Sequence, residues 1–345
     1  MENNITHGIQ YHFFVVGERP FCLWGNDVRE NTISFLDKID PTYFEYVAKT
    51  NFQYIQQGSG EEKDSQHAAI SVRAAYSQGL ETMFALICAA IQAPHCVSSW
   101  LNEYKGIELY SIVKKIHRNN PIFSTSKADS ISWSDISEFV FSHIKFASQE
   151  KEKAVKKGFA NLWSKFAVKF IDDDFTTEYN SIKHGLRIKS GSFKLAIGRQ
   201  EKWGEPAPPE NMRLVSANNF GTSFFRNKKI GELKHHIYLE EKSLNWNPES
   251  YLYGLHMISM SIHNVKSRLR IFNGVPPEKV EFFFPEDISD FEKPWECTRE
   301  IGLLSMTLPH SVIMPVLIEH FSKDDILSQY KSEKLQGVKF ISECK

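Results

Sequence analysis

The chain has 345 residues, 41% of them apolar and 24% charged, and it includes 26 Phe, 12 Tyr and 7 Trp. Aromatic side chains bury large apolar areas, so this composition excludes a disordered chain and predicts a globular protein with a large core. The longest apolar stretch, residues 79–93, contains Glu81 and Gln92 and is shorter than the ~20 residues that a membrane helix needs. We therefore expect no membrane partner.

The cysteine pattern and the N-terminus bear on the cellular compartment. Five cysteines are scattered along the chain without a C-x-x-C pair, which argues against a zinc knuckle and a disulfide framework. Residues 1–10 lack the basic head and apolar run of a secretory signal. The sequence therefore predicts a cytoplasmic protein, and we expect neither a metal nor another cofactor.

Charge is distributed unevenly along the chain, although the formal net charge is only −1. Residues 145–236 carry 18 lysine and arginine side chains against 10 aspartate and glutamate side chains, while both flanking segments are acidic. A basic segment of this kind is typical of a surface that binds nucleic acid. The alternative interpretation is a set of lysine-rich helix faces that are solvated or paired within the fold.

Residues 1–60 are expected to form an N-terminal elaboration of strands and helices. The run Tyr11–Val16, which ends before Gly17, predicts a short strand. A helix is expected to begin after Asp40 and Pro41, because Asp is a favourable cap and Pro is favourable in the first turn.

The best-defined predicted element is a long helix within residues 66–93. Apolar side chains recur every three or four residues from Ala69 to Ile91, and Pro94 ends the pattern. Small residues occupy much of the remaining surface, so other helices can approach this one closely. Further helices are predicted at residues 97–104, 107–117, 132–143, 148–170 and 175–186.

The periodicity changes from helical to alternating over residues 191–246. Four short alternating runs are separated there by Pro-rich and Asn-Gly-containing loops, which predicts a β-rich insertion. Helical spacing returns at residues 248–272, between a typical start at Asn247-Pro248 and a typical end at Asn273-Gly274.

Residues 276–345 are mixed, with a strand expected at residues 280–284 and a helix at residues 313–320. The fold class that we predict is mainly α. Its core is an antiparallel helical bundle formed by residues 61–190 and 247–275, with the β-rich insertion and a mixed α/β C-terminal region attached.

Sequence motifs of several enzyme classes are missing. Neither phosphate-cradling glycine loop is present, and the chain has no G-x-S-x-G elbow and no H-E-x-x-H pair. The run Asp172-Asp173-Asp174 has two interpretations. Its carboxylates suit Mg²⁺, or they form a solvated junction between two helices, which is the commoner role of such a run.

The most informative polar segment covers residues 178–187. If one helix continues through it, a histidine, an amide and a guanidinium share one helix face, where they can hold a phosphate or transfer a proton. The polar stripe on that face consists of Asp173, Thr177, Asn180, His184 and Arg187.

The same segment is also a typical helix end. Basic side chains such as Lys183 and His184 complement the negative end of the helix dipole, and Gly185 supplies a left-handed cap. The spacing favours this interpretation, which removes Arg187 from the stripe.

Two other helices carry polar residues at helical spacing. Arg73, Ser77 and Glu81 form a line on the long helix, and His256 and His263 share one face of the helix at residues 248–272. Buried charges are normally paired, so we expect Glu81 to contact Arg73 or a basic residue of another helix. Such a pair is either a structural tie or the floor of a cleft.

The sequence Y-N-S-I-K-H-G at residues 179–185, followed after the β insertion by I-S-M-S-I-H-N-V at residues 258–265, resembles bacterial members of the HEPN helical superfamily. The resemblance covers residues 62–275. It implies an antiparallel helical bundle of a kind found in toxin–antitoxin and anti-phage systems, in which many members are metal-independent ribonucleases.

This chain departs from the nuclease members in one respect. Those members carry Arg followed after four to six residues by His on one helix, and no Arg in this sequence has a His at that spacing. The nearest arrangement, His263 before Arg268, is reversed. The resemblance therefore implies the fold more than the nuclease activity.

We accordingly expect a HEPN-like accessory or RNA-associated binding protein of a bacterial defence or stress system, without catalysis. RNA, a co-encoded protein and a second copy of the chain are the expected partners. The residues expected to bind are Asn180, Lys183, Glu81, Arg73 and Arg268.

Two alternatives stay open. One is a metal-independent ribonuclease in which His184 is the acid/base, Arg187 clamps phosphate and His263 assists. The other is a structural scaffold that dimerises and has no activity.

Overall fold

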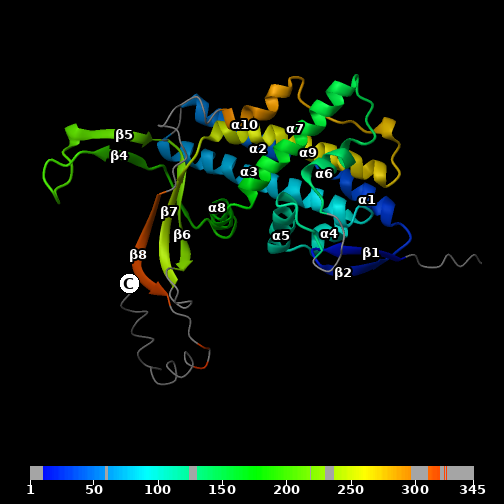
Figure 1. Ribbon diagram of the computed structural model, residues 1–345, viewed down its shortest axis with the longest axis horizontal. Coiled ribbons are helices and arrows are strands. Elements are labelled where there is room, and N and C mark those ends of the chain that lie inside the picture. Colours follow the sequence, from blue (N-terminus) through cyan, green and yellow to red (C-terminus); the bar gives the residue numbers. More distant parts are fainter. Residues whose placement is uncertain are drawn as a thin grey trace, which may run out of the picture.

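The computed structural model describes residues 11–58, 61–123, 130–217, 219–229, 237–296 and 310–318, together with Ser322 and Asp324. A body of packed helices carries a small antiparallel sheet at one side (Figure 1). The predicted mainly α fold is therefore confirmed.

The central element is α3 (Glu62–Gln92), which lies where the sequence predicts the long helix. From Met83 to Ala90 its side chains are buried on every face, as expected for a helix segment with neighbours all around it. α2 (Tyr43–Gln57) packs along α3 in the antiparallel direction. Their adjoining ends are linked by a hydrogen bond from Tyr54 Oη to Asp64 Oδ2 (3.4 Å).

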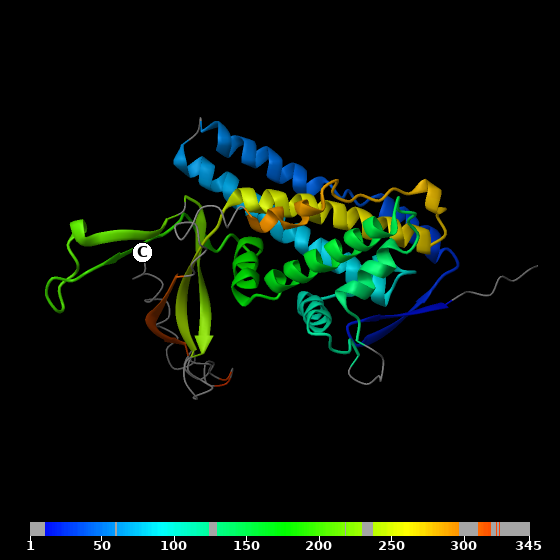
Figure 2. The same cartoon turned by 45° about the horizontal axis from the view of Figure 1, so that its top comes forward.

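α9 (Pro248–Phe272) packs against α3 and α2 and coincides with the predicted helix. Gly254 lies so close to Tyr76 that a Cβ atom there would be 2.7 Å from the ring, and Asn273 Nδ2 donates to Pro94 O (2.8 Å) at the other end. α9 is therefore parallel to α3, contrary to the expected antiparallel bundle. The reason is that the β segment returns the chain to the end at which α3 begins (Figure 2).

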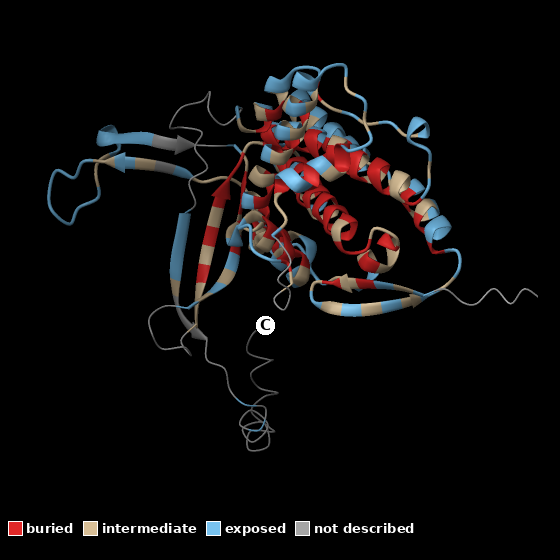
Figure 3. Ribbon diagram, turned by 45° about the vertical axis from the view of Figure 1, so that its right-hand side comes forward, coloured by how far each residue is buried: buried red, intermediate tan, exposed pale blue. Residues whose placement is uncertain are grey.

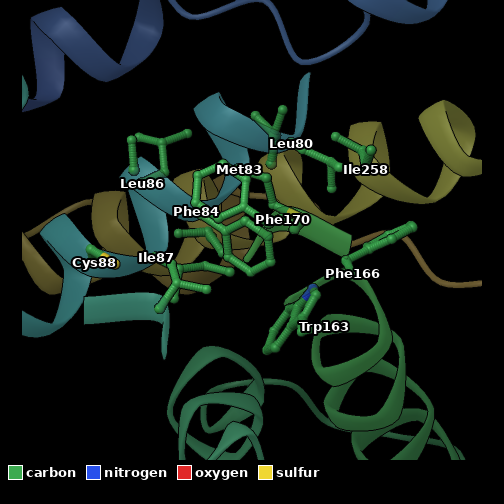
Figure 4. Close-up of a cluster of buried hydrophobic side chains, with 14 of the residues drawn as sticks. Leu80, Met83, Phe84, Leu86, Ile87, Cys88, Trp163, Phe166, Phe170 and Ile258 are labelled. Atoms are coloured by element: carbon green, nitrogen blue, oxygen red, sulfur yellow. The ribbon is translucent and has the colours of Figure 1, made fainter. Parts of the chain in front are cut away.

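Four further helices complete the helical body: α4 (Val97–Glu103), α5 (Gly106–His117), α6 (Trp133–Phe141) and α7 (Gln149–Phe170). Their buried faces point inward and their polar faces outward (Figure 3). Large apolar side chains from three helices meet in the centre (Figure 4): Leu80, Met83, Phe84, Trp163, Phe166, Phe170 and Ile258. This core fixes the helices on which the sheet and the candidate site rest.

α8 (Asp173–Lys183) lies between the helical body and the sheet (Figure 1). The sheet is antiparallel with the order β3-β6-β7-β8. Its strands are β3 (Ile188–Ser190), β6 (Gly221–Lys229), β7 (Ile237–Asn245) and β8 (His310–Ile318). The predicted β-rich insertion at residues 191–246 thus supplies two strands of this sheet, β6 and β7, while β3 directly precedes it and β8 comes from the C-terminal region.

The remaining strands of the insertion form a separate hairpin, β4 (Lys194–Gly198) and β5 (Met212–Ala217). It extends away from the rest of the molecule (Figure 1). Within the residues described, β4 and β5 pair only with each other.

The N-terminal residues form more structure than the sequence predicts. β1 (Tyr11–Val16) is the expected strand, and it pairs with β2 (Arg19–Trp24), which is followed by α1 (Val28–Asp37). Phe14 and Val16 are buried on the inner face of this hairpin, so the hairpin is part of the core packing.

Two expectations for the C-terminal region are wrong. Residues 280–284 are extended but not paired in a sheet, because side chains of α9 satisfy their backbone. Asn264 binds both the N–H and the C=O of Phe283, and Ser267 Oγ donates to Glu281 O. After this extended segment, a short helix α10 (Lys293–Glu296) contacts α9.

The helix expected at residues 313–320 is instead part of strand β8 as far as Ile318, and residues 319 and 320 lie outside the described residues. β8 pairs with β7 from His310 onward. A short apolar run is compatible with either a helix or a buried strand. Here its pairing with β7 stabilises the strand.

By length and composition, α3 is apolar enough to cross a membrane, although its sequence was expected to be too short and too polar. In the structure 72% of its apolar window is buried against other parts of the protein. Burial of this kind is typical of the core helix of a bundle.

Candidate functional site

A polar cleft of about 800 Å³ lies between α8 and strand β6. Its lining includes four cationic side chains and one carboxylate, with hydroxyl and amide groups between them. The lining residues are Asp173, Thr176, Thr177, Asn180, Ser181, Arg187, Phe225, Arg226, Asn227, Lys228 and Lys229. Both walls belong to the basic middle of the sequence.

The wall formed by α8 depends on how this helix ends. The helix stops at Lys183, and Gly185 (φ +100°) and Leu186 (φ +49°) turn the chain through the left-handed region. Backbone bonds from Leu186 N to Ile182 O (3.3 Å) and from Arg187 N to Ser181 O (2.6 Å) hold the turn. The cap interpretation of the sequence is therefore confirmed.

The turn does not separate Arg187 from the polar face of α8. It directs the chain into β3, and Arg187 lines the same cleft as Asn180. Of the five residues on the predicted polar stripe, only His184 is not part of the lining.

The wall formed by β6 is anchored by Glu240 of β7, which is fully buried. Arg226 Nε and Lys228 Nζ both donate to its carboxylate, the latter over 2.7 Å. Burial alone raises the pKa of Glu240, but these two cations outweigh it and hold the pKa at about 2. Glu240 therefore keeps two basic side chains of the cleft in place.

α8 and β6 are also joined directly. Arg226 Nη1 donates to Asp174 Oδ1 (2.5 Å), and Lys242 forms an ion pair with the other oxygen of Asp174. Asp172 Oδ1 accepts from the N–H groups of Asp174 and Phe175 and so caps α8. The aspartate run is thus a helix junction with separate structural roles, as the commoner interpretation predicts.

The side chains of Arg187 and Lys229 have no ion-pair partner among the residues that the structure describes. Both are exposed, and Phe225, which belongs to the same lining, is 53% exposed. Two unneutralised cations and an open aromatic face make this cleft suited to an anionic ligand that also carries flat rings.

A buried network below the cleft holds α8 against α3. Arg73 Nε donates to Glu178 Oε2 (2.9 Å), and Trp246 Nε1 donates to the other oxygen (3.0 Å), to which Thr222 Oγ1 also donates. Arg73 also donates to Ser77 (3.1 Å) and is itself buried. Each nitrogen of the Arg73 guanidinium thus donates to one of these partners, so in this structure Arg73 is a structural tie.

Glu81 is paired with α8 as expected. Its carboxylate accepts from Tyr179 Oη (2.6 Å) and from Lys183 Nζ (3.1 Å). The prediction that Glu81 contacts a basic residue of another helix is confirmed, and the contact ties α3 to the end of α8.

The other nominated residues lie away from the cleft lining. His184 is exposed at the end of α8. His263 on α9 packs edge-on against Phe283 (4.4 Å between ring centroids), and burial, with Lys266 nearby, lowers its pKa. Among the described residues, no side-chain contact joins His184, Arg187 and His263.

Arg268 is buried near the C-terminal end of α9. Its Nε donates to Phe139 O (2.9 Å), and the guanidinium lies over the Phe139 ring at 4.3 Å. Burial lowers its pKa. The structure therefore brings together Asn180 and Arg187 in one cleft and leaves Arg268 in a separate packing contact.

Phe225, Lys228 and Lys229 are residues of the cleft that the sequence interpretation did not single out. The alternating run at residues 222–225 and the basic middle of the chain were visible, but neither indicates which helix the strand faces. Strand alternation combined with exposed basic residues after Phe225 was the only available signal.

No group of three His, Cys, Asp or Glu side chains placed to hold a metal ion occurs within the described parts of the chain. Comparisons with known proteins found no matching family model, no matching curated protein and no matching solved structure.

Proposed function

We propose that this chain is an RNA-associated binding protein that holds single-stranded RNA in the cleft between α8 and β6. The observation that carries the proposal is the pair of unneutralised cations, Arg187 and Lys229, which line the same cleft as the exposed side chain of Phe225. A single strand offers both a phosphate backbone for the cations and unstacked bases for the ring.

The electrostatic contribution comes from phosphate neutralisation. Each cation that contacts a phosphate releases condensed counterions, so affinity falls steeply as salt rises. Arg187 is suited to a two-point contact with phosphate oxygens, and Lys229 acts as a point charge. Lys228 adds charge while Glu240 holds its position.

Phe225 contributes by stacking. A base stacked on an aromatic side chain stabilises a single-stranded complex by about 1–3 kcal/mol, with little preference for sequence. Asn180 and Thr177, which line the opposite wall, offer hydrogen-bonding groups to the sugar or the base edge.

Kinship with the HEPN superfamily is part of the same proposal. The Y-N-S-I-K-H-G segment forms the last turns of α8 and its cap, and it faces α3 through Glu81, so the motif supports both the cleft and the helical core. In this proposal the protein is a non-catalytic component of a bacterial defence or stress system, with a co-encoded protein or a second copy as further partners.

The test is binding of a labelled single-stranded RNA by fluorescence anisotropy over a range of salt concentrations. In the double variant Arg187→Gln/Lys229→Gln we expect the Kd to rise at least about tenfold. The slope of log Kd against log salt should fall by about 1.4, because two phosphate contacts are lost. Phe225→Ala should weaken binding by about 1–3 kcal/mol without changing that slope.

The matched control is Lys153→Gln/Lys157→Gln, which removes the same charge from exposed positions on α7. It should bind RNA like the unaltered protein. Equal weakening by both double variants would show that binding is not at the cleft, and an absence of RNA binding at low salt would reject the function. RNA cleavage in EDTA that is lost in His184→Ala would replace binding by the ribonuclease alternative.

A further inference from the structure

A second pocket, of about 300 Å³, lies on the other side of α8. It is formed where α7, α8, strand β7 and the start of α9 meet. Its walls are largely aromatic and aliphatic, and charged groups occur at its α3, α7 and α8 sides. The lining consists of Arg73, Val168, Lys169, Asp172, Asp174, Phe175, Glu178, Leu244, Trp246 and Tyr251.

Nearly every charged group of this lining has a partner. Arg73 and Glu178 bind each other, and Asp174 binds Arg226 and Lys242. Asp172 caps the first turn of α8. These groups hold the pocket together and leave little free charge for a ligand.

Lys169 is the exception. Among the described residues its amine has neither a hydrogen bond nor an ion pair, although it lines the pocket and is only partly exposed. Burial, together with the nearby positive charge of Arg73, lowers the pKa of Lys169 to about 8, while Asp172 acts weakly in the opposite direction. About a tenth of this amine is therefore neutral at pH 7, far more than for a lysine of ordinary pKa.

The lining also restricts the charge of a ligand. An anion would lie beside Asp172, Asp174 and Glu178, and a cation would lie beside Arg73 and Lys169. The walls made by Trp246, Tyr251 and Phe175 favour a neutral, apolar or aromatic body.

We propose that this pocket binds a neutral aldehyde or ketone with an apolar body and that Lys169 forms an imine with it. The lone pair of the amine attacks the carbonyl carbon, and the oxygen takes up a proton to give a carbinolamine. Loss of that oxygen as water, with the nitrogen proton, leaves the C=N bond, so no oxidant or reductant is needed. This activity is independent of RNA binding in the α8–β6 cleft.

The test uses the full chain, benzaldehyde as the probe, and cyanoborohydride to reduce the imine to a stable amine. Peptide mass mapping then measures labelling of each lysine at pH 7. We expect Lys169 to be labelled at least about tenfold faster than Lys157, an exposed lysine of the same helix, because an amine of ordinary pKa is almost fully protonated at this pH.

Three variants separate the pocket from general reactivity. Lys169→Arg keeps the positive charge and should lose only the label at residue 169. The amine of Lys165 is bound to Glu292, so Lys165→Arg should leave the labelling of Lys169 unchanged. Val168 is exposed at the edge of the pocket, and Val168→Phe should reduce labelling of Lys169 at least about threefold by blocking entry.

Three results would overturn the proposal. The first is labelling of Lys169 at the same rate as Lys157. The second is labelling that Val168→Phe leaves unchanged. The third is no preference for benzaldehyde over acetaldehyde relative to the exposed lysines, which would show a reactive amine without a binding pocket.

Discussion

At the scale of single residues, the carboxyl group of Glu178 organises the contact between the helical body and the sheet. It is completely buried, and its partners come from α3, from β6 and from Trp246 between β7 and α9. Removing one member of a buried ion pair leaves the other charge without compensation, which costs far more than loss of an exposed pair. The exposed end of α8 offers the contrast, since Lys183 pairs with Glu81 partly in solvent.

We expect Glu178→Ala to lower the free energy of unfolding by about 3–5 kcal/mol, because Arg73 then stays buried without its carboxylate. Lys183→Ala should cost less than about 1 kcal/mol. Urea unfolding followed by circular dichroism measures both changes. A double variant, Arg73→Met/Glu178→Leu, should recover most of the loss, and failure to recover any of it would assign the effect to Trp246 and Thr222 instead.

At the scale of elements, α2 and α9 are linked by a buried carboxylate near the surface of the bundle. Glu45 accepts from His256 Nδ1 (3.0 Å) and pairs with Lys49 (2.6 Å). Burial raises the pKa of Glu45, but the bonds from His256 and Lys49 outweigh it and hold the pKa at about 2, below the ordinary value of 4.5. The folded state therefore binds the proton at this position more weakly than the unfolded state does.

Because of this lowered pKa, the free energy of unfolding depends on pH. The contribution of Glu45 is complete above about pH 4.5 and is lost as pH falls toward 2, since the unfolded chain takes up the proton first. We expect Glu45→Gln to lower the free energy of unfolding by about 2 kcal/mol at pH 7 and to make the loss of stability between pH 5 and pH 3 correspondingly smaller. Glu62→Gln, at an exposed position, is the control, and identical pH profiles for all three proteins would contradict the assignment.

At the scale of the whole molecule, the two hairpins relate to the core in different ways. The β1–β2 hairpin buries Phe14 and Val16 in the main core, whereas the β4–β5 hairpin extends from the sheet, with Trp203 in its connecting loop 99% exposed. An isolated two-stranded hairpin contributes little stability of its own. The base of the β4–β5 hairpin is held by Asn245, which hydrogen-bonds to both the N–H and the C=O of Phe193 (3.0 and 2.8 Å).

Replacing residues 194–217 by a short Gly-Ser linker should therefore change the free energy of unfolding by less than about 1 kcal/mol. Val16→Ala, by contrast, should cost about 1–3 kcal/mol, because it removes buried methyl groups and leaves a cavity. Thermal and urea unfolding check both changes. A loss of several kcal/mol on removing the hairpin would show that it packs against a part of the molecule that these contacts do not include.

Much of the helical architecture was predictable from the sequence, because helix periodicity and caps are local. α3 and α9 follow apolar spacing over many turns, and Asn247-Pro248 and Gly185 mark a helix start and a helix end where the structure has them. The candidate site was predictable only in part. The sequence indicated Asn180 and Arg187 as residues of one polar helix face. In the structure the helix ends between them, and the turn after Lys183 brings Arg187 to the cleft that Asn180 lines.

The sequence by itself determined most of the helical segments, where several of them end, and that a basic segment occupies the middle of the chain. Only the tertiary structure decided that α9 runs parallel to α3, that residues 310–318 form a strand, and that Phe225, Lys229 and Arg187 line one cleft. Local periodicity and capping act within a few residues along the chain. Strand pairing, the direction of a returning helix and the partner of a buried charge depend on residues far apart in sequence, so packing alone fixes them.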